Sequence, residues 1–124
     1  MKEKFVTITG FNHYHGIAPL RPGKLVLCKK EPDNIYDSEA ICCTVPVYGK
    51  LGYIANSTGT VAGGTMSAGR IYDSVCSKFY VRVLFTTCTK VICRVEDAEP
   101  DELRSEIISQ YTLDWENDGE DEED

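Results

Sequence analysis

The sequence has no long hydrophobic run. None of its apolar stretches approaches the roughly 18 residues that a membrane-spanning helix requires. The first residues, Met-Lys-Glu-Lys, lead into alternating apolar and polar residues instead of the apolar block of a signal peptide. We therefore expect a soluble, cytoplasmic protein that makes no membrane contact. Its 124 residues suit one domain with a hydrophobic core.

The common sequence signatures of catalysis are also missing. There is neither a GxxxxGK[ST] phosphate loop nor a GxSxG nucleophile motif. His13, His15 and Asp37 could be arranged as a base with an orienting acid, and Ser38 or a cysteine as a nucleophile, but no recognised spacing connects them. We expect a protein without enzymatic activity and without a cofactor.

The six cysteines form no CxxC pair, and the two histidines lie far from them in sequence. Most of the cysteines lie inside apolar runs that resemble strands. Without an export signal the compartment is expected to be reducing, which argues against a disulfide framework. The pattern favours buried cysteines that pack as small hydrophobic residues over a zinc site, and we expect no bound metal. The six are Cys28, Cys42, Cys43, Cys76, Cys88 and Cys93.

The net charge of −7 divides unevenly along the chain. Residues 1–94 contain 12 Lys and Arg against 6 Asp and Glu, whereas residues 95–124 contain one Arg against 14 acids. A basic body with an acidic end is typical of nucleic-acid contact through the body. The acidic end has two alternatives: it keeps the protein soluble, or its eight acids in residues 114–124 mimic nucleic acid and occupy a basic site on this molecule or on a protein partner.

Alternation with a period of two predicts several short strands. We expect strands over residues 5–9, 24–29, 40–45, 50–54, 78–86 and 90–95, the last two forming a hairpin. Gly52 interrupts one of them, which often marks a bulge or the close approach of another backbone.

Two helices are expected. Asn56 or Ser57 could cap a short, weak helix over residues 56–68, although Gly59, Gly63 and Gly64 oppose it. Pro100 and apolar residues at three- and four-residue spacing predict an amphipathic helix over residues 100–113.

The predicted architecture is mainly β: a small OB-like or SH3-like barrel with one short internal helix and a C-terminal amphipathic helix. We expect the barrel domain over residues 1–99, the helix of residues 100–113 packed on or beside it, and a disordered acidic segment over residues 114–124. A barrel leaves its functional loops at the rim.

The segment from Glu31 to Ile41 has the composition of a functional loop that leads into a strand. Pro32 fixes its own backbone, and Asp33, Asn34 and Asp37 are residue types that cap turns. Tyr36 and Asp37 would then be displayed at the end of a rigid turn. An aromatic face beside a carboxylate can stack a base and accept a hydrogen bond from a sugar hydroxyl. The alternative is an Asx turn with a packed tyrosine.

The ordered motifs resemble the HIRAN domain family over residues 4–95. They are Gly10 followed by an aromatic loop, Leu25-Val26-Leu27, the segment from Glu31 to Asp37 running into Ala40-Ile41, and Gly52-Tyr53-Ile54. The family is best known from the N-terminal module of helicase-like transcription factor and also occurs as small stand-alone bacterial proteins. The resemblance implies an OB-like barrel that captures the 3′ end of single-stranded DNA in a replication or repair setting. An ATPase or helicase partner in trans is a further implication.

The resemblance also assigns roles to individual positions. It implies that Tyr36 stacks on the terminal base and that Asp37 accepts a hydrogen bond from the 3′-hydroxyl. Tyr14 matches an aromatic position of the family. Asn12 and His13 stand where an arginine and a tyrosine are expected, Tyr53 replaces a histidine, and Asn56 replaces a lysine that contacts phosphate. The candidate nucleic-acid-binding residues are therefore Asn12, His13, Tyr14, Asn34, Tyr36, Asp37, Tyr53 and Asn56.

Overall fold

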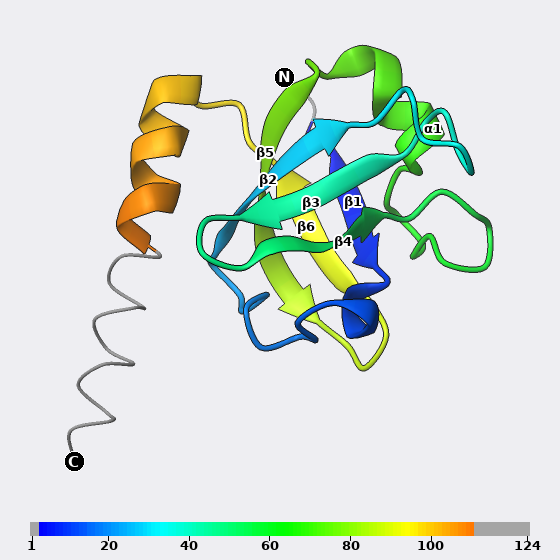
Figure 1. Ribbon diagram of the computed structural model, residues 1–124, viewed down its shortest axis with the longest axis horizontal. Helices are drawn as coiled ribbons and strands as arrows, with labels where there is room; N and C mark the ends of the chain where they lie inside the picture. The colour runs from blue at the N-terminus through cyan, green and yellow to red at the C-terminus, as the bar shows by residue number, and fades with distance from the viewer. Residues whose placement is uncertain (1–2, 111–124) are drawn as a thin grey trace.

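Six antiparallel strands close into a barrel in the order β1-β4-β3-β2-β5-β6 (Figure 1). The computed structural model describes residues 3–110, so the predictions for residues 111–124 lie outside the described part. The strands are β1 (Phe5–Thr9), β2 (Leu25–Lys30), β3 (Ile41–Val45), β4 (Gly49–Ile54), β5 (Lys78–Thr86) and β6 (Val91–Val95). The short helices are η1 (Phe11–His13), α1 (Ala68–Ile71) and η2 (Tyr72–Ser74). The predicted small β-barrel is confirmed, and the hairpin of β5 and β6 is part of it.

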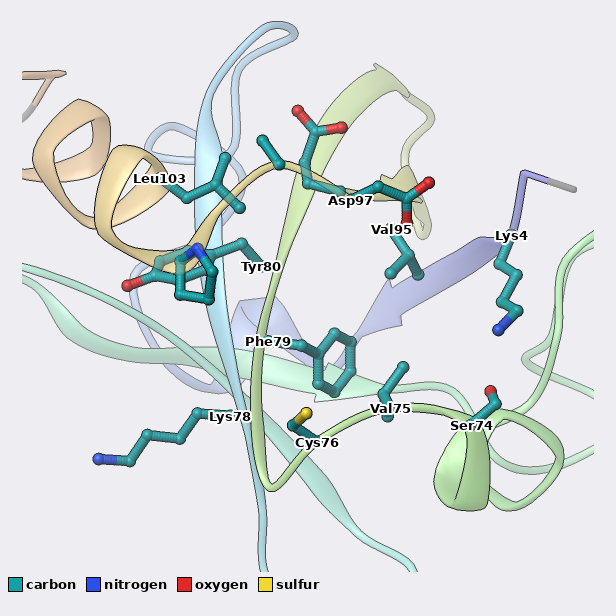
Figure 2. Close-up of a pocket in the computed structure, with 13 residues that line it drawn as sticks. Lys4, Ser74, Val75, Cys76, Lys78, Phe79, Tyr80, Val95, Asp97 and Leu103 are labelled. Carbon is teal, nitrogen blue, oxygen red and sulfur yellow. The ribbon is translucent and has the colours of Figure 1, made fainter. Parts of the chain in front are cut away.

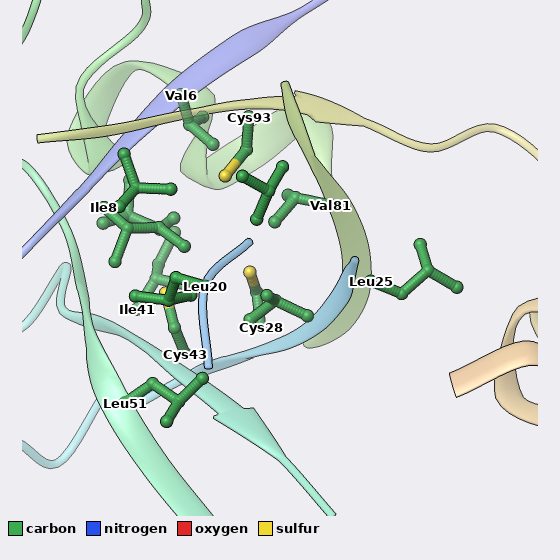
Figure 3. Close-up of a cluster of buried hydrophobic side chains, with 14 of the residues drawn as sticks. Val6, Ile8, Leu20, Leu25, Cys28, Ile41, Cys43, Leu51, Val81 and Cys93 are labelled. Atoms are coloured by element: carbon green, nitrogen blue, oxygen red, sulfur yellow. The ribbon is translucent and has the colours of Figure 1, made fainter. Parts of the chain in front are cut away.

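The barrel interior is filled by the alternate side chains of all six strands (Figure 3). Val6, Ile8, Cys28, Cys43 and Cys93 are fully buried there. The thiols of the three cysteines lie among branched aliphatic side chains, and burial raises the pKa of Cys43 and Cys93 well above the ordinary value. These cysteines therefore pack as small hydrophobic residues, as predicted. Cys76 and Cys88 lie in loops outside the strands and are exposed, so the prediction of burial was wrong for these two.

A β-bulge lies between β3 and β4 at Gly52. The register passes from Cys43 opposite Gly52 to Thr44 opposite Lys50, so that Leu51 is the extra residue of β4. A Cβ atom at Gly52 would lie 2.7 Å from the backbone oxygen of Thr9, which explains why glycine occupies this position. Because of the bulge, Lys50 and Tyr53 project from the same outer face of the barrel despite their spacing of three residues.

The internal helix lies later in the chain than predicted. Residues 56–67 form turns, and α1 begins only at Ala68. Ser67 is its N-cap, and the Ser67 side chain accepts a hydrogen bond from the Arg70 N–H. The prediction of a helix over residues 56–68 was wrong because the Asn56 side chain bonds other segments instead of capping its own, which leaves a glycine-rich stretch without a helix start.

The helix that begins at residue 100 extends to the last described residue, 110, and packs beside β2 and β5 (Figure 1). Leu103 and Ile107 are buried against the barrel. The Gln110 side chain accepts a hydrogen bond from the Leu25 N–H and donates one to the Leu25 carbonyl. None of the helices within residues 3–110 is both long and apolar enough to cross a membrane.

Candidate nucleic-acid interface

An open groove of about 590 Å³ lies at one rim of the barrel, between the β2–β3 loop, the segment after η1 and the end of β4. Three tyrosines, one carboxylate and two side-chain amides line it. They come from three separate parts of the sequence, and they are six of the eight predicted site residues: Tyr14, Asn34, Tyr36, Asp37, Tyr53 and Asn56.

The β2–β3 loop is held by Asn34. Its side-chain oxygen accepts hydrogen bonds from the Tyr36 N–H at 2.9 Å and the Asp37 N–H at 3.1 Å, and its amide donates to Glu31. This is an Asx turn, as the loop composition indicated. The Tyr36 side chain is nevertheless 91% exposed, so the turn displays the ring instead of packing it.

Asp37 is oriented by two neutral donors. The Glu39 N–H donates to one carboxylate oxygen at 2.9 Å, and the Asn56 amide donates to the other, also at 2.9 Å. Asn56 in turn accepts a hydrogen bond from the Gly69 N–H in α1 at 2.8 Å. A Cβ atom at Gly69 would lie 2.6 Å from a Glu39 carboxylate oxygen and 3.2 Å from the Asn56 side-chain oxygen, so only glycine fits without displacement. The first residues of α1 therefore fix the direction of the Asp37 carboxylate.

Tyr53 is held between a cation and an anion. Lys50 donates to the Tyr53 hydroxyl at 2.9 Å, and that hydroxyl donates to Glu31 at 2.8 Å. Burial alone would raise the pKa of Glu31, but hydrogen bonds from Asn34 and Tyr53 and the charge of Lys50 outweigh it and lower that pKa. The hydrogen bond to Tyr53 raises the pKa of Lys50. Lys50 and Glu31 are thus both charged at neutral pH.

Tyr14 lies on the other side of Lys50. The Lys50 ammonium is 5.9 Å from the centre of the Tyr14 ring and 5.2 Å from that of Tyr53. The Tyr14 side chain is 42% exposed, which leaves part of the ring available to a ligand. Two tyrosines therefore share one cation beside the groove. The exposed Tyr36 ring lies in a loop whose backbone is held by the neutral side chain of Asn34.

Asn12 and His13 lie elsewhere. Both are exposed on η1, and neither is among the residues that line the groove. Neighbouring His15 donates from its Nε2 to the Tyr48 carbonyl oxygen at 2.9 Å and packs edge-on against the Tyr48 ring.

Three residues that build the site were not among the predicted site residues, although Lys50 was one of four cations, with Arg70, Lys78 and Arg82, for which a binding patch and a solvated strand face were both left open. The positions of Glu31 and Lys50 at Tyr53 depend on the strand register, and the close packing of Gly69 depends on the turns before α1. For Gly69, the only local signal was its position: it follows the N-cap Ser67 and the first helical residue, Ala68.

The cysteine near the groove has an unreactive thiol. Cys42 is the cysteine beside Glu31 and Lys50, and burial raises the pKa of its thiol to about 11, so that it stays protonated at neutral pH. Within residues 3–110 no three His, Cys, Asp or Glu side chains are grouped as metal ligands would be.

A closed antiparallel barrel with an open aromatic groove at its rim defines a small β-barrel binding module. The model of the HIRAN domain matches residues 1–88, and the chain therefore belongs to the HIRAN family of nucleic-acid-binding modules.

A solved HIRAN domain has the same fold. The crystal structure of the HIRAN domain of human HLTF is similar with a TM-score of 0.54 and 17% identity, over 90% of this chain and 87% of that one. A protein from Lactobacillus plantarum is similar with a TM-score of 0.49 and 23% identity, over 76% of this chain and 93% of that one. No curated protein matches the chain in sequence.

Proposed function

We propose that the groove binds the 3′ end of single-stranded DNA without catalysis. The observation that carries this proposal is the joint position of Tyr36 and Asp37: an exposed ring and a hydrogen-bonded carboxylate, consecutive in sequence, at one open groove. Free 3′ ends of single strands occur in replication and repair, where a separate ATPase or helicase would act on the strand that this protein binds.

Tyr36 supplies the stacking surface for the terminal base. Its ring is almost fully exposed while its backbone is fixed by Asn34, so a base can stack on it with little ordering of the loop. Stacking of one base on an aromatic side chain contributes about 1–3 kcal/mol and tolerates any sequence. We expect little base preference at this position.

Asp37 supplies recognition of the terminal hydroxyl. Each carboxylate oxygen already accepts one hydrogen bond, and an ionised carboxylate has about four acceptor positions, so it can still accept from a 3′-hydroxyl. A hydrogen bond to a charged group contributes about 1.5–3 kcal/mol. A 3′-phosphate would instead bring a second negative charge against Asp37 and be repelled.

Titration of the parent protein with three forms of one labelled oligonucleotide tests the proposal: a free 3′-hydroxyl, a 3′-phosphate, and a closed circle without ends. We expect the free 3′-hydroxyl to bind at least about tenfold more tightly than the other two, from the energy of the terminal hydrogen bond. Equal affinity for all three forms would contradict end recognition.

The stacking role has a matched control in the same loop. Tyr36→Ala should lower affinity on the order of tenfold through the loss of one stacked base. Ile35→Ala removes the neighbouring side chain, which is 87% exposed, and should leave affinity unchanged. An equal loss in both variants would assign the effect to the loop's hydrophobic surface instead of to the ring.

A further inference from the structure

The strand register places a row of side chains across the outer face of the barrel, starting at the groove. Tyr53 on β4 lies opposite Cys42 on β3, Cys42 opposite Lys29 on β2, and Lys29 opposite Lys78 on β5. Residues that face each other across neighbouring strands project to the same side of a sheet. At a strand spacing of about 4.8 Å, Lys29 lies about 10 Å and Lys78 about 15 Å from Tyr53 across the sheet.

Two more cations adjoin this row. The bulge in β4 puts Lys50 on the same outer face, bonded to Tyr53. On the same side of the row as Lys50, Arg104 of the C-terminal helix and Lys29 line one hollow of about 400 Å³, together with Leu27 and Tyr80. We call Lys50, Lys29, Lys78 and Arg104 the basic track.

The pair of Lys29 and Lys78 is unfavourable in the free protein. Like charges directly opposite each other on adjacent strands are destabilising, and within residues 3–110 neither lysine forms an ion pair. Figure 2 shows the Lys78 side chain extending away from the apolar side chains of Phe79 and Val75. A bound anion would relieve this repulsion.

Glu31 is the acidic group beside the start of the track. It accepts hydrogen bonds from Asn34 and Tyr53, and its carboxylate lies 3.8 Å from the Lys50 ammonium. The negative charge of Glu31 is therefore neutralised mainly by Lys50. The track therefore keeps an excess of positive charge from Lys29 onward.

We propose that the basic track binds the sugar–phosphate backbone of the same single strand whose 3′ end enters the groove. This inference rests on the proposed function. The last nucleotide contacts Tyr36 and Asp37, and the phosphates of the nucleotides on its 5′ side pass Lys50 and cross β3 and β2 toward Lys78. Phosphate contacts hold a strand without reading its sequence, and Tyr80 offers a ring beside the cations.

The experiment compares short and long strands. The double variant Lys29→Gln with Lys78→Gln is titrated with 3′-hydroxyl oligothymidines of about two and about ten nucleotides, at several salt concentrations. We expect the long strand to bind on the order of a hundredfold more weakly at about 50 mM salt, with a salt slope smaller by about 1.4, because each lost contact to a single strand removes about 0.7. The dinucleotide should bind the variant as tightly as the parent.

Two controls separate charge from structure. Lys29→Arg with Lys78→Arg should keep parental affinity for the long strand, because it keeps both charges. Lys90→Gln removes one charge in the turn after the far end of β5, away from Lys78, and should leave the salt slope unchanged. The glutamine pair should be at least as stable as the parent, since it removes a repulsive pair.

The outcomes decide between the alternatives. An unchanged salt slope for the long strand, or an equal loss for both lengths, would overturn the track. If polyglutamate of equal length competes as well as the oligonucleotide, the face fits an acidic protein segment instead, and the proposal is also overturned. If the long strand depends on the lysines but the parent shows no preference for a 3′-hydroxyl, the track stands and end recognition fails.

Discussion

The groove and the docked C-terminal helix each depend on a carboxylate that receives two hydrogen bonds, but the donors differ. Glu106 on the helix accepts both bonds from the Arg82 guanidinium, at 2.7 and 3.0 Å, and these bonds lower the pKa of Glu106. Asp37 in the groove accepts from a backbone N–H and from the Asn56 amide. The first carboxylate has its charge cancelled by its partner, whereas the second is oriented by groups that carry no charge.

This difference separates a structural contact from a binding contact. A bidentate guanidinium pair is saturated and holds two segments together. A carboxylate fixed by neutral donors keeps its charge and part of its accepting capacity for a ligand. We call the contact of Arg82 with Glu106 and Glu96 the helix dock. Substitutions there should change the stability of the fold, and substitutions around Asp37 should change recognition of the 3′ end.

Arg82→Met should produce the largest effect on stability. It leaves Glu96 and Glu106 without the guanidinium that joins them, and the Arg82 side chain is only 23% exposed. Hydrogen bonds to charged groups contribute about 1.5–3 kcal/mol, so we expect the free energy of unfolding to fall by about 2 kcal/mol in urea denaturation. The ratio of affinities for a 3′-hydroxyl and a 3′-phosphate should be the same as in the parent.

Arg94→Met is the matched control for that change. Arg94 contacts the same Glu96 at 3.3 Å but is 37% exposed and lies 4.0 Å from Glu3. Exposed pairs contribute about 0–1 kcal/mol, so we expect a smaller loss of stability. Equal losses in the two variants would contradict the special role of the helix dock.

Gly69→Ala should disturb the groove with little change in stability. The added methyl group meets Glu39 and Asn56, and the bond from Asn56 to Asp37 must shift with it. The preference for a 3′-hydroxyl should fall several-fold, which is on the order of 1 kcal/mol. Gly63→Ala is the control, since a Cβ atom there meets nothing within 4 Å. An unchanged preference in Gly69→Ala would show that α1 does not orient Asp37.

Asn56→Lys should steepen the salt dependence of strand binding and lower the preference for a 3′-hydroxyl, because it replaces the neutral bonds of Asn56 to Asp37 and Gly69 with a cation. It places a cation at the groove, where the family resemblance expects a phosphate contact. We expect a salt slope for single strands that is steeper by about 0.7. Asn12→Lys adds the same charge on η1 outside the groove, and it should not change the slope. Identical slopes in the two variants would mean that the groove is not the path of the strand.

The pH dependence of the helix dock should be the smallest effect. The pKa of Glu106 is lowered in the folded protein from an ordinary value of 4.5. Its contribution to stability is therefore present above about pH 4.5 and is lost as the pH falls through the folded-state pKa. Because Glu106 is 45% exposed, we expect a difference of less than about 1 kcal/mol between parent and Glu106→Gln at pH 7. Urea denaturation should show this difference vanish near pH 3, and a difference that persists there would contradict the role of the ionised carboxylate.

The strands could be predicted because alternation is a local property. Phe5–Thr9 and Lys78–Thr86 begin and end where the pattern places them. Alternation failed at Phe85, which is exposed because the register with β6 shifts between Val83 and Phe85. A bulge depends on the partner strand, and one strand's sequence does not contain it.

The site could be predicted only in part for the same reason. The turn chemistry of Asn34 follows from the loop itself, whereas the loop alone left open whether Tyr36 is displayed or packed. The bond of Asn56 to both Asp37 and Gly69 joins three segments, and the wrong helix over residues 56–68 came from assigning Asn56 a local capping role. Long-range partners of polar side chains, such as Lys50 with Tyr53 and Glu31, become visible only with the register.

The most direct test of the account is the ratio of affinities for a 3′-hydroxyl and a 3′-phosphate in Asp37→Ala, measured beside the parent and beside Asp33→Ala. Asp33 is an exposed acid of the same loop, so its variant controls for charge. We expect a ratio of about ten or more in the parent and in Asp33→Ala, and a ratio near one in Asp37→Ala. A parental ratio in Asp37→Ala would contradict the central role of this carboxylate.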